Sequence, residues 1–472
     1  MSAGAALALL PALAADPAAQ APAIEFRFGD LAWGGLRIEQ VALEATAGAG
    51  WFARIGPLSF AQRRLGELSA RCTSGSWRWP EPVCADGELR WQLDGGAALT
   101  GRFELGPEKA AIRLGRLALQ VRRWRGPDWA LEAHLRPLPL TAAERFLPAG
   151  AGWPVPSGGE LEATLSATPA GIRGRVSAQS LSFDNADGTV AGVDLGIGAG
   201  FEMTPAEAGE WQWRGELTWR SGEALFGRWY LAAPENPVTL EFNGRRLVNG
   251  SLELARFAFD DPGVASARGS ARWAAPLSPL PATGVLDSLQ IDLAPFKRRY
   301  LSGLLAPLAL SGLGIAGKVE LDGRYQGTRD WRLAGRLEQV AVDDPEQRFA
   351  IRGLSGRWQW SGERSGQAQF RWSGADVYRL PLAASELQLQ LAPDSVALAQ
   401  PFRQPVLGGA LRIDTLSLTG IGAAADGVPG VGIDAEIEPL DLRRLTAALG
   451  WPEFGGELSG RIRDLRREGE VW

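Results

Sequence analysis

Apolar and polar residues alternate along most of this chain with a period of two. In the segment EWQWRGELTWR (210–220), Trp211, Trp213, Leu217 and Trp219 fall on one parity, and mostly polar residues fall on the other. Successive side chains of a β-strand point to opposite faces, so this pattern predicts a strand with one apolar and one polar face. Antiparallel sheets commonly divide their two faces in this way.

The same alternation recurs in the second half of the chain. The segment GRWQWSGERSGQAQFRWSG (356–374) predicts two strands around a turn, with Trp358 and Trp360 on the apolar face of the first strand and Phe370 and Trp372 on that of the second. Aromatic residues of this size are common in strands. The sequence therefore predicts wide aromatic surfaces on one face of successive strands.

A third segment, SELQLQLAPDSVALAQ (385–400), predicts a hairpin. Leu387, Leu389 and Leu391 share one parity and lead into a Pro-Asp turn, after which apolar residues resume the alternation. These leucines join the tryptophans as candidate residues of the apolar face.

A repeat is superimposed on the strands. Three segments have a helical pattern, at 139–147, 295–306 and 440–450, and each precedes a strand led by glycine, at residues 159, 317 and 456. The chain therefore predicts tandem units with a period of about 140–160 residues. The expected divisions are 24–137 for the first unit, 138–291 for the second, 292–438 for the third, and 439–472 for the start of a fourth unit that is cut short.

We predict from these patterns an all-β fold with a few short helices, in which tandem units build a long antiparallel sheet. With strands about 4.8 Å apart, such a sheet would extend on the order of 170 Å. Three short helices cannot cover its apolar face. The sheet must fold into sandwiches, close into barrels, or curl lengthwise into a trough; tryptophans fill a core in the first two cases and line a channel in the third.

Composition offers little for chemistry at a catalytic centre. The chain has one histidine, His134, and two cysteines, and its net charge is −5 with basic residues scattered among acidic ones. We therefore predict no enzymatic activity, no metal and no cofactor. Because nucleic-acid binding needs a concentrated basic surface, we also predict no nucleic-acid partner.

The first residues and the cysteines point to export. Residues 1–15 carry a short apolar run with a small-x-small pattern, which predicts a signal peptide or the remnant of an N-terminal anchor. Cys72 and Cys84 flank a turn-rich stretch compatible with a hairpin closed by a disulfide, a bond that persists in oxidising compartments. The alternative is a pair of reduced, buried thiols.

Two further motifs have a functional and a plain interpretation. GLGIAG (312–317) fits the glycine pattern of dinucleotide sites, but it precedes a strand instead of opening a helix, so a turn is favoured. Acidic or Asx pairs follow apolar strands at 184–185, 260–261 and 343–344. Because Asp and Asn are ordinary turn formers, turns are favoured over paired catalytic carboxylates or a calcium site.

Helix, glycine-led strand and alternating strands follow one another in PLDLRRLTAALGWPEFGGELSGRIRDL (439–465) and in LAPLALSGLGIAGKVELDGRYQG (305–327). In this combination the chain resembles the AsmA-like superfamily, and within it the YdbH branch, which is related to TamB and YhdP. The resemblance implies a repeating β-groove, taco-shaped and apolar inside, anchored at the inner membrane of a Gram-negative envelope. It further implies a periplasmic protein that lets phospholipid acyl chains move towards the outer membrane, with envelope proteins as partners.

The expected function is therefore lipid binding or conduction along an apolar groove between the two membranes. The expected lining comprises Trp211, Trp213, Leu217, Trp219, Trp358, Trp360, Phe370, Trp372, Leu387, Leu389 and Leu391. The alternative is an exported structural or carbohydrate-binding β-repeat protein whose tryptophans fill cores or stack on sugars. An outer-membrane barrel is disfavoured, because it would need aromatic girdles at the strand ends and the chain has only four tyrosines.

Overall fold

The computed structural model describes most of the chain after residue 22. The described ranges are 23–33, 36–46, 50–60, 63–78, 81–93, 98–123, 126–143, 154–275, 278, 280–306, 310–327, 330–421 and 430–467. The expected signal or anchor segment, 1–15, lies outside them. The chain divides into two compact units, Met1–Leu135 and Arg136–Trp472, and this division falls beside the expected boundary at 137–138.

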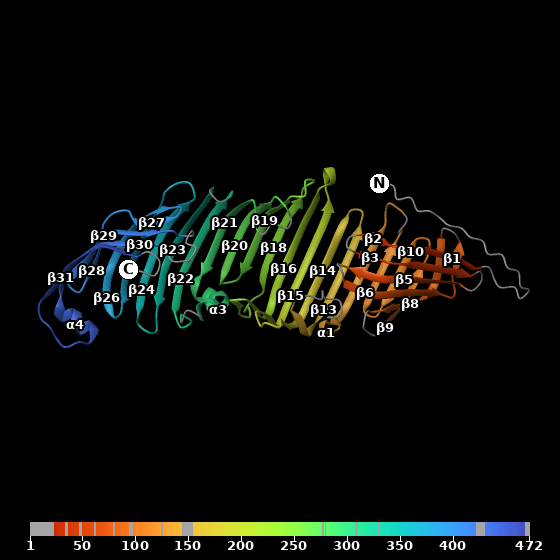
Figure 1. Ribbon diagram of the computed structural model, residues 1–472, viewed down its shortest axis with the longest axis horizontal. Helices are drawn as coiled ribbons and strands as arrows, with labels where there is room; N and C mark the ends of the chain where they lie inside the picture. Colours follow the sequence, from red (N-terminus) through yellow and green to blue (C-terminus); the bar gives the residue numbers. More distant parts are fainter. Residues whose placement is uncertain are drawn as a thin grey trace, which may run out of the picture. The chain divides into compact units, whose positions relative to one another are not determined.

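Unit 1 is built from short and medium antiparallel strands (Figure 1). They are β1 (Ala23–Phe28), β2 (Leu31–Trp33), β3 (Leu36–Ile38), β4 (Val41–Thr46), β5 (Gly50–Phe60), β6 (Arg63–Cys72), β7 (Ser76–Arg78), β8 (Glu81–Gln92), β9 (Ala98–Leu105), β10 (Lys109–Leu114), β11 (Leu117–Arg122) and β12 (Ala130–Pro139), which continues across the division. Its core gathers around Trp51, Leu89 and Phe103, with the Trp51 and Phe103 ring centroids 5.4 Å apart.

Unit 2 is a succession of longer antiparallel strands that pair mainly in chain order. They are β13 (Val155–Thr168), β14 (Gly171–Asp184), β15 (Val190–Pro205), β16 (Trp211–Phe226), β17 (Trp229–Leu231), β18 (Val238–Arg246), β19 (Leu252–Asp261), β20 (Ala265–Trp273), β21 (Thr283–Asp292), β22 (Gly314–Tyr325), β23 (Trp331–Asp343), β24 (Phe349–Ser361), β25 (Gly366–Val377), β26 (Leu380–Ala392), β27 (Ser395–Leu398), β28 (Phe402–Val406), β29 (Gly409–Thr419), β30 (Gly430–Asp441) and β31 (Glu457–Arg467). The predicted class, all-β with an antiparallel sheet and few helices, is confirmed.

Helices are short and lie along one edge of the unit 2 sheet, the lower edge in Figure 1. They are α1 (Leu140–Ala143), the continuous run of α2 (Leu293–Phe296), η3 (Lys297–Leu301) and α3 (Ser302–Leu305), and α4 (Leu442–Leu449). A 3₁₀ turn, η2 (Glu207–Gly209), joins β15 to β16 at the opposite edge. The second and third predicted helices are thus confirmed; the first begins as expected, and its residues 144–147 lie outside the described part. None of the helices in the described residues has the length and apolar character needed to cross a membrane.

Aspartates begin two of these helices. The Asp292 carboxylate accepts a hydrogen bond from the Ala294 backbone N–H at 3.3 Å, and the Asp441 carboxylate accepts one from Arg443 at 2.9 Å. Such caps satisfy N–H groups that have no partner within the helix. Each of these two helices therefore starts directly where a strand ends, after β21 and after β30.

A buried cluster fastens the helical run 293–305 to the sheet. The Asp261 carboxylate, 1% exposed, accepts a hydrogen bond from the Tyr300 hydroxyl at 2.7 Å and lies 3.3 Å from Arg299. Burial raises the pKa of Asp261 even though both neighbours favour its ionised form. Burial, followed by the hydrogen bond to Asp261, also raises the pKa of Tyr300. Removing one partner would leave a buried polar group without its hydrogen bond, so the three side chains together hold the helical run against the sheet.

Bulges cross the unit 2 sheet in lines and recur further along the chain, near the glycine-led strands expected at 159 and 317. The first line includes Gly159 at φ +105°, Ser180 at φ +50° and Asp194 at φ +53°, where the pairing shifts register. Gly317 and Gln339, at φ +108° and +49°, occupy the equivalent places in the next repeat. Bulges bend a strand and increase its twist, so these lines are where the sheet curls.

The three Asx or acidic pairs form turns, as predicted. The backbone N–H of Asn185 donates to Val190 O at 2.9 Å, and that of Asp344 donates to Phe349 O at 3.1 Å. The second residue of each pair is buried: Asn185, Asp261 and Asp344. GLGIAG also holds a turn, followed by β22 from Gly314, so the phosphate-cradling helix start is absent there.

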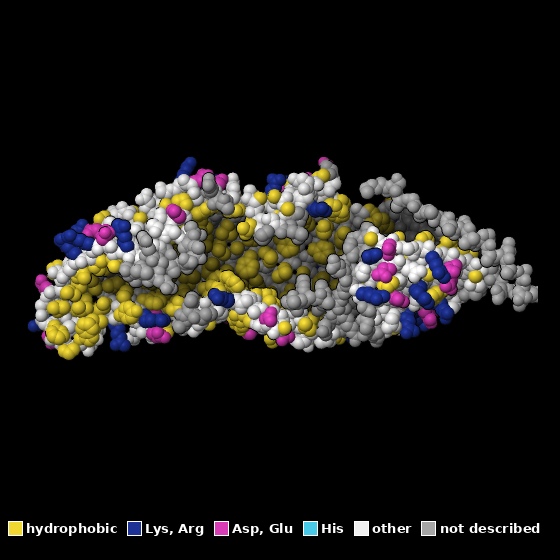
Figure 2. All heavy atoms as spheres, viewed as in Figure 1, with side chains coloured by type: hydrophobic (Ala, Val, Ile, Leu, Met, Phe, Trp, Pro, Cys, Tyr) yellow, Lys and Arg dark blue, Asp and Glu magenta, His cyan; other side chains and the backbone are white. Residues whose placement is uncertain are grey.

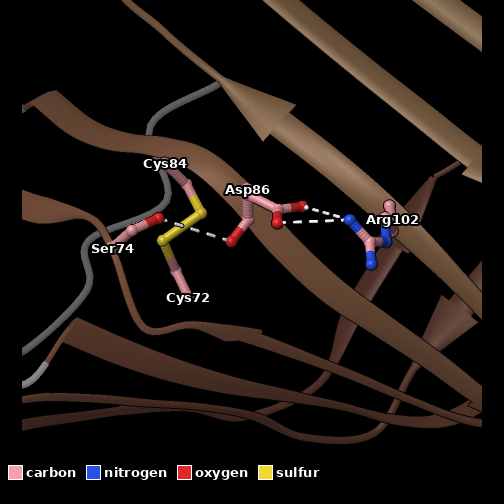
Figure 3. The surroundings of a disulfide bond; sticks show 5 residues. All are labelled: Cys72, Ser74, Cys84, Asp86 and Arg102. Atoms are coloured by element: carbon pink, nitrogen blue, oxygen red, sulfur yellow. Dashed lines mark hydrogen bonds and ion pairs between the residues drawn. A yellow bond between two sulfur atoms is a disulfide. The ribbon is translucent and has the colours of Figure 1, made fainter.

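The predicted disulfide of unit 1 is present. Cys72 at the end of β6 is bonded to Cys84 in β8, with their Cα atoms 5.9 Å apart and both residues buried (Figure 3). The adjoining segment is held by Arg102, whose Nη1 lies 3.3 Å from the Asp86 carboxylate, and by Ser74, whose hydroxyl donates to Asp86 O at 3.5 Å. The bond sits within the apolar core around Trp51 and excludes the alternative of two free thiols.

Candidate ligand-binding groove

Unit 2 is hollowed on one side, and hydrophobic side chains cover the interior of the hollow (Figure 2). The strand register explains this surface, because directly opposite residues on neighbouring strands share a face. One such row crosses the sheet through Leu165, Gly174, Phe201, Gly215, Phe242, Phe257, Gly269, Leu286, Gly323, Leu333 and Trp360. Every member is apolar or glycine, so the row forms a continuous greasy band.

A second row runs beside the first, offset by two residues on each strand except β21, where a bulge makes the offset three. It comprises Ala163, Val176, Ala199, Leu217, Leu240, Phe259, Ala267, Leu289, Leu321, Gly335, Trp358, Ala368, Leu389 and Leu398. Together we call the two rows the groove floor. Their side chains belong to strands that are far apart in sequence, yet the alternation keeps them on one face.

The residues predicted to line a groove lie on the groove-floor face of four strands. Trp211, Trp213, Leu217 and Trp219 lie on β16, Trp358 and Trp360 on β24, Phe370 and Trp372 on β25, and Leu387, Leu389 and Leu391 on β26. Leu389 pairs with Ala368, which in turn pairs with Trp358, so the last three strands share one surface. The β16 set and the β24–β26 set occupy different stretches of that face.

Aromatic partners that the sequence reasoning did not single out complete these sets. Phe242 lies beside Trp213 with ring centroids 5.7 Å apart, and Trp331 lies beside Trp360 at 5.8 Å. Phe402 lies 5.8 Å from Trp372. The alternation in VTLEFNGRR (238–246) carried the signal for Phe242, but the pairing across strands is needed to see the contact.

Glycines lie opposite many of the rings. In seven direct cross-strand pairs of the described part of unit 2, an aromatic ring lies over the glycine opposite: Gly174–Phe201, Gly192–Phe183, Gly215–Phe242, Gly244–Trp213, Gly269–Phe257, Gly335–Trp358 and Gly356–Phe370. A Cβ added at these glycines would approach the ring to between 2.2 and 2.8 Å. Each ring therefore lies over the space that a side chain would fill, and the floor stays shallow and wide.

Parts of the floor remain open to solvent. Val176 and Phe201 are 38% exposed and Leu217 is 39% exposed, although all three sit in the middle of long strands. The tryptophans of the floor are half-buried. Side chains that filled a closed sandwich core would be covered on both sides, so the described chain leaves this face without a second layer.

The indole N–H groups of four tryptophans on the groove-floor face are either bonded to backbone carbonyls or buried. Trp360 Nε1 donates to Ala392 O at 2.7 Å, and Trp219 Nε1 donates to Ser221 O at 2.9 Å. Trp213 Nε1 and Trp372 Nε1 are buried and have no hydrogen-bond partner among the described residues. The rings of the floor thus turn their apolar area, and few polar atoms, towards the hollow.

The opposite face of the same strands is polar and held by ion pairs. Glu202 bridges Arg173 and Arg214, and hydrogen bonds from both guanidinium groups lower the pKa of its carboxyl. Arg352 pairs with Asp376 at 2.6 Å in the same manner. Charge is therefore concentrated on the face that points away from the groove floor.

Potential metal ligands do not gather in the part of this site that the structure describes. Within the described ranges, no group of three or more His, Cys, Asp or Glu residues is placed to hold a metal ion. His134 lies on β12 of unit 1, opposite Ala118. What the groove floor offers is apolar area along many strands.

Comparisons with protein-family models, with curated proteins and with solved structures find no match to this chain.

Proposed function

We propose that this chain binds or conducts lipid, with acyl chains lying on the groove floor of unit 2 and headgroups remaining in water. The observation that carries the proposal is the pair of apolar rows that cross the sheet and stay partly exposed. Removing one CH₂ group from water contributes about 0.8 kcal/mol, so an acyl chain gains from every strand it crosses. Binding of this kind needs no catalytic group.

The shape of the floor favours a mobile chain over a fixed small molecule. Glycines beneath the rings keep the surface shallow, and no charged residue interrupts the two rows. An acyl chain on such a surface meets similar apolar contacts from strand to strand. The floor is therefore suited to sliding, and phospholipid is the proposed cargo.

The wider setting rests on the resemblance to the AsmA-like superfamily. On that hypothesis the protein works in the periplasm between inner and outer membranes, with envelope proteins as partners. The buried disulfide of unit 1 agrees with an oxidising compartment, where such bonds persist. The same bond would suit any exported protein, so the setting depends on the lipid result.

Mass spectrometry of organic extracts tests the proposal. The chain would be exported to an oxidising compartment, purified in mild detergent, and compared with an unrelated soluble protein purified in the same way. We expect phospholipid enriched over that control at one or more molecules per chain. A folded protein free of lipid would refute the proposal and favour a structural or carbohydrate-binding repeat.

Matched substitutions test the assignment of the lining. Trp213→Glu and Trp360→Glu place a charge on the groove-floor face, whereas Gln212→Glu and Gln359→Glu place it on the exposed polar face one residue away. We expect bound lipid to fall at least several-fold in the first two variants and to change little in the last two. Equal losses in all four folded variants would sink the lining assignment.

A further inference from the structure

One exposed arginine lies on the apolar, groove-floor face of the unit 2 sheet, where charged side chains are rare. Among the described strand residues from β13 to β30, the register places two charged side chains on the groove-floor face, Asp261 and Arg246. Asp261 is buried and fastened to Arg299 and Tyr300. Arg246, the last residue of β18, is exposed.

The neighbours of Arg246 on this face are apolar and aromatic. It lies directly opposite Trp211 on β16 and Leu252 on β19, and Leu252 lies opposite Trp273 on β20. Gly244, the preceding residue on the same face of β18, has no side chain to cover it. The guanidinium group therefore stands at the rim of the groove between two tryptophan-bearing strands.

Arg246 also lacks a counter-ion. The adjacent Arg245 points to the polar face, where its Nε lies 2.9 Å from Glu253, and Arg352 and Arg403 are paired with Asp376 and Glu438 in the same way. No described residue forms an ion pair or hydrogen bond with the side chain of Arg246. Its five N–H donors are free for a ligand.

We propose that Arg246 binds the phosphate of a phospholipid headgroup at the rim of the groove while the acyl chains lie on the floor beside it. This inference rests on the proposed lipid function and narrows it to a substrate class. The positive guanidinium group of arginine complements the negative phosphate, and its planar N–H groups can donate two parallel hydrogen bonds to phosphate oxygens. Trp211 and Trp273 flank this position, and indoles favour the boundary between apolar and aqueous surroundings.

The edge of the sheet at this point suits entry of such a lipid. The turn after β18 exposes Val248 to 68%, and the loop after β20, on the same edge, exposes Leu280 to 67%. The helices α1, α3 and α4 lie along the other edge. An amphiphile that reaches the Arg246 edge meets apolar tips first, then a positive charge, then the floor.

A lipid competition separates this inference from the general proposal. Purified chain, in a buffer free of phosphate, would be mixed with detergent micelles holding equal amounts of phosphatidylglycerol and diacylglycerol with identical acyl chains. After gel filtration, mass spectrometry gives the ratio of the two lipids bound. We expect wild type to prefer phosphatidylglycerol and Arg246→Gln to lower that preference about three- to tenfold, since an exposed charge-assisted bond is weaker than a buried one.

Three controls make the result specific. Arg245→Gln, on the polar face, should keep the wild-type ratio, and Arg246→Lys should keep part of it because the charge remains. In micelles that hold diacylglycerol without phosphatidylglycerol, the amount bound per chain should be equal in wild type and Arg246→Gln. Higher salt should lower the wild-type preference and leave diacylglycerol binding unchanged, because salt screens exposed charges.

The outcomes distinguish the two proposals. Equal preference in wild type and Arg246→Gln, with both lipids bound, would overturn the role of Arg246 and leave the lipid-binding groove standing. A loss of both lipids from a folded Arg246→Gln protein would mean that the residue shapes the groove and does not select the headgroup, which also overturns the inference. If neither lipid binds to wild type, both proposals fail.

Discussion

Trp358 rests over a glycine on the neighbouring strand, and substituting that glycine should displace the ring. A Cβ at Gly335 would lie 2.2 Å from Cζ2 and 2.5 Å from Cη2 of Trp358. The backbone of Gly335 does not have a positive φ, so alanine itself is tolerated there. The destabilising part of the effect of Gly335→Ala therefore comes from the ring.

The magnitude follows from three contributions. Overpacking of this kind costs about 1–3 kcal/mol. Moving the ring also weakens its contact with Phe370, whose centroid is 6.2 Å away. Against this, alanine in a strand interior is favoured over glycine by about 0.5–1 kcal/mol. We expect a net loss of about 1–2 kcal/mol in the local opening free energy of β23 and β24.

Hydrogen exchange on peptides from 331–343 and 349–361 measures that loss, and a double-mutant cycle identifies its cause. In a Trp358→Ala background, Gly335→Ala should be neutral or stabilising, giving a coupling of about 2 kcal/mol. Gly284→Ala is the control, because it lies on the same face and its Cβ would have its nearest neighbour, Ser270 O, at 3.8 Å. Additive effects of Gly335→Ala and Trp358→Ala would refute the reasoning.

Three other substitutions test the curl, the disulfide and a turn. Gly159→Ala should destabilise β13 and β14 by about 1–3 kcal/mol because of its positive φ and a Cβ 2.7 Å from Leu181 Cα, whereas Gly158→Ala, with its nearest atom at 3.9 Å, should be nearly silent in hydrogen exchange. Replacing both Cys72 and Cys84 by alanine should cost unit 1 about 3 kcal/mol in denaturant unfolding by the chain-entropy relation; an unchanged midpoint would argue against it. Hydrogen bonds from Arg348 lower the pKa of Asp344. The stability that the ionised carboxylate contributes is therefore complete above pH of about 4 and is lost as the pH falls through the folded pKa. Backbone hydrogen exchange in the turn 343–349, corrected for its intrinsic pH dependence, should rise on acidification, and Asp344→Asn should remove that rise.

Strand alternation was sufficient to predict the fold class and several local registers. The hairpin around 393–394 forms with Leu391 opposite Val396 and Leu389 opposite Leu398, as the parity of the leucines required. Period-two patterns are reliable here because one face meets water and the other does not. The disulfide was also predictable, since few pairings exist for two cysteines.

The bulges could not be read in advance. At Ser180 the apolar parity changes, from Val176 and Ala178 before the bulge to Leu181 and Phe183 after it. In the sequence of one strand, such a change of parity only interrupts the alternation. It is recognised as a bulge once the matching bulge on the neighbouring strand, at Gly159, is known. Curvature is a property of aligned bulges across several strands, and alignment appears only once the pairing is known.

Arg246 is a second example of what the sequence of a single strand can and cannot predict. In VTLEFNGRR the parity of Val238, Leu240 and Phe242 extends through Gly244 to Arg246, so the sequence already placed a charge on the apolar face. The sequence of β18 could not show that Arg246 lacks a counter-ion or lies opposite Trp211, because both features depend on the pairing with β16 and β19. Strand faces are thus a local property of the sequence, whereas a site is a property of the pairing.

The rows and the glycines together bear on what kind of device the groove can be. A deep aromatic pocket would hold one ligand tightly and release it slowly, because every buried CH₂ adds about 0.8 kcal/mol to the barrier for leaving. A floor flattened by Gly335 and its counterparts spreads the same contacts over many strands, so a chain that leaves one contact gains the next. Exposed side chains such as Phe201 and Leu217 keep the path open at its middle. Smooth apolar contact along the floor, with the headgroup selection that we propose confined to Arg246 at the rim, would allow an amphiphile to move along the sheet.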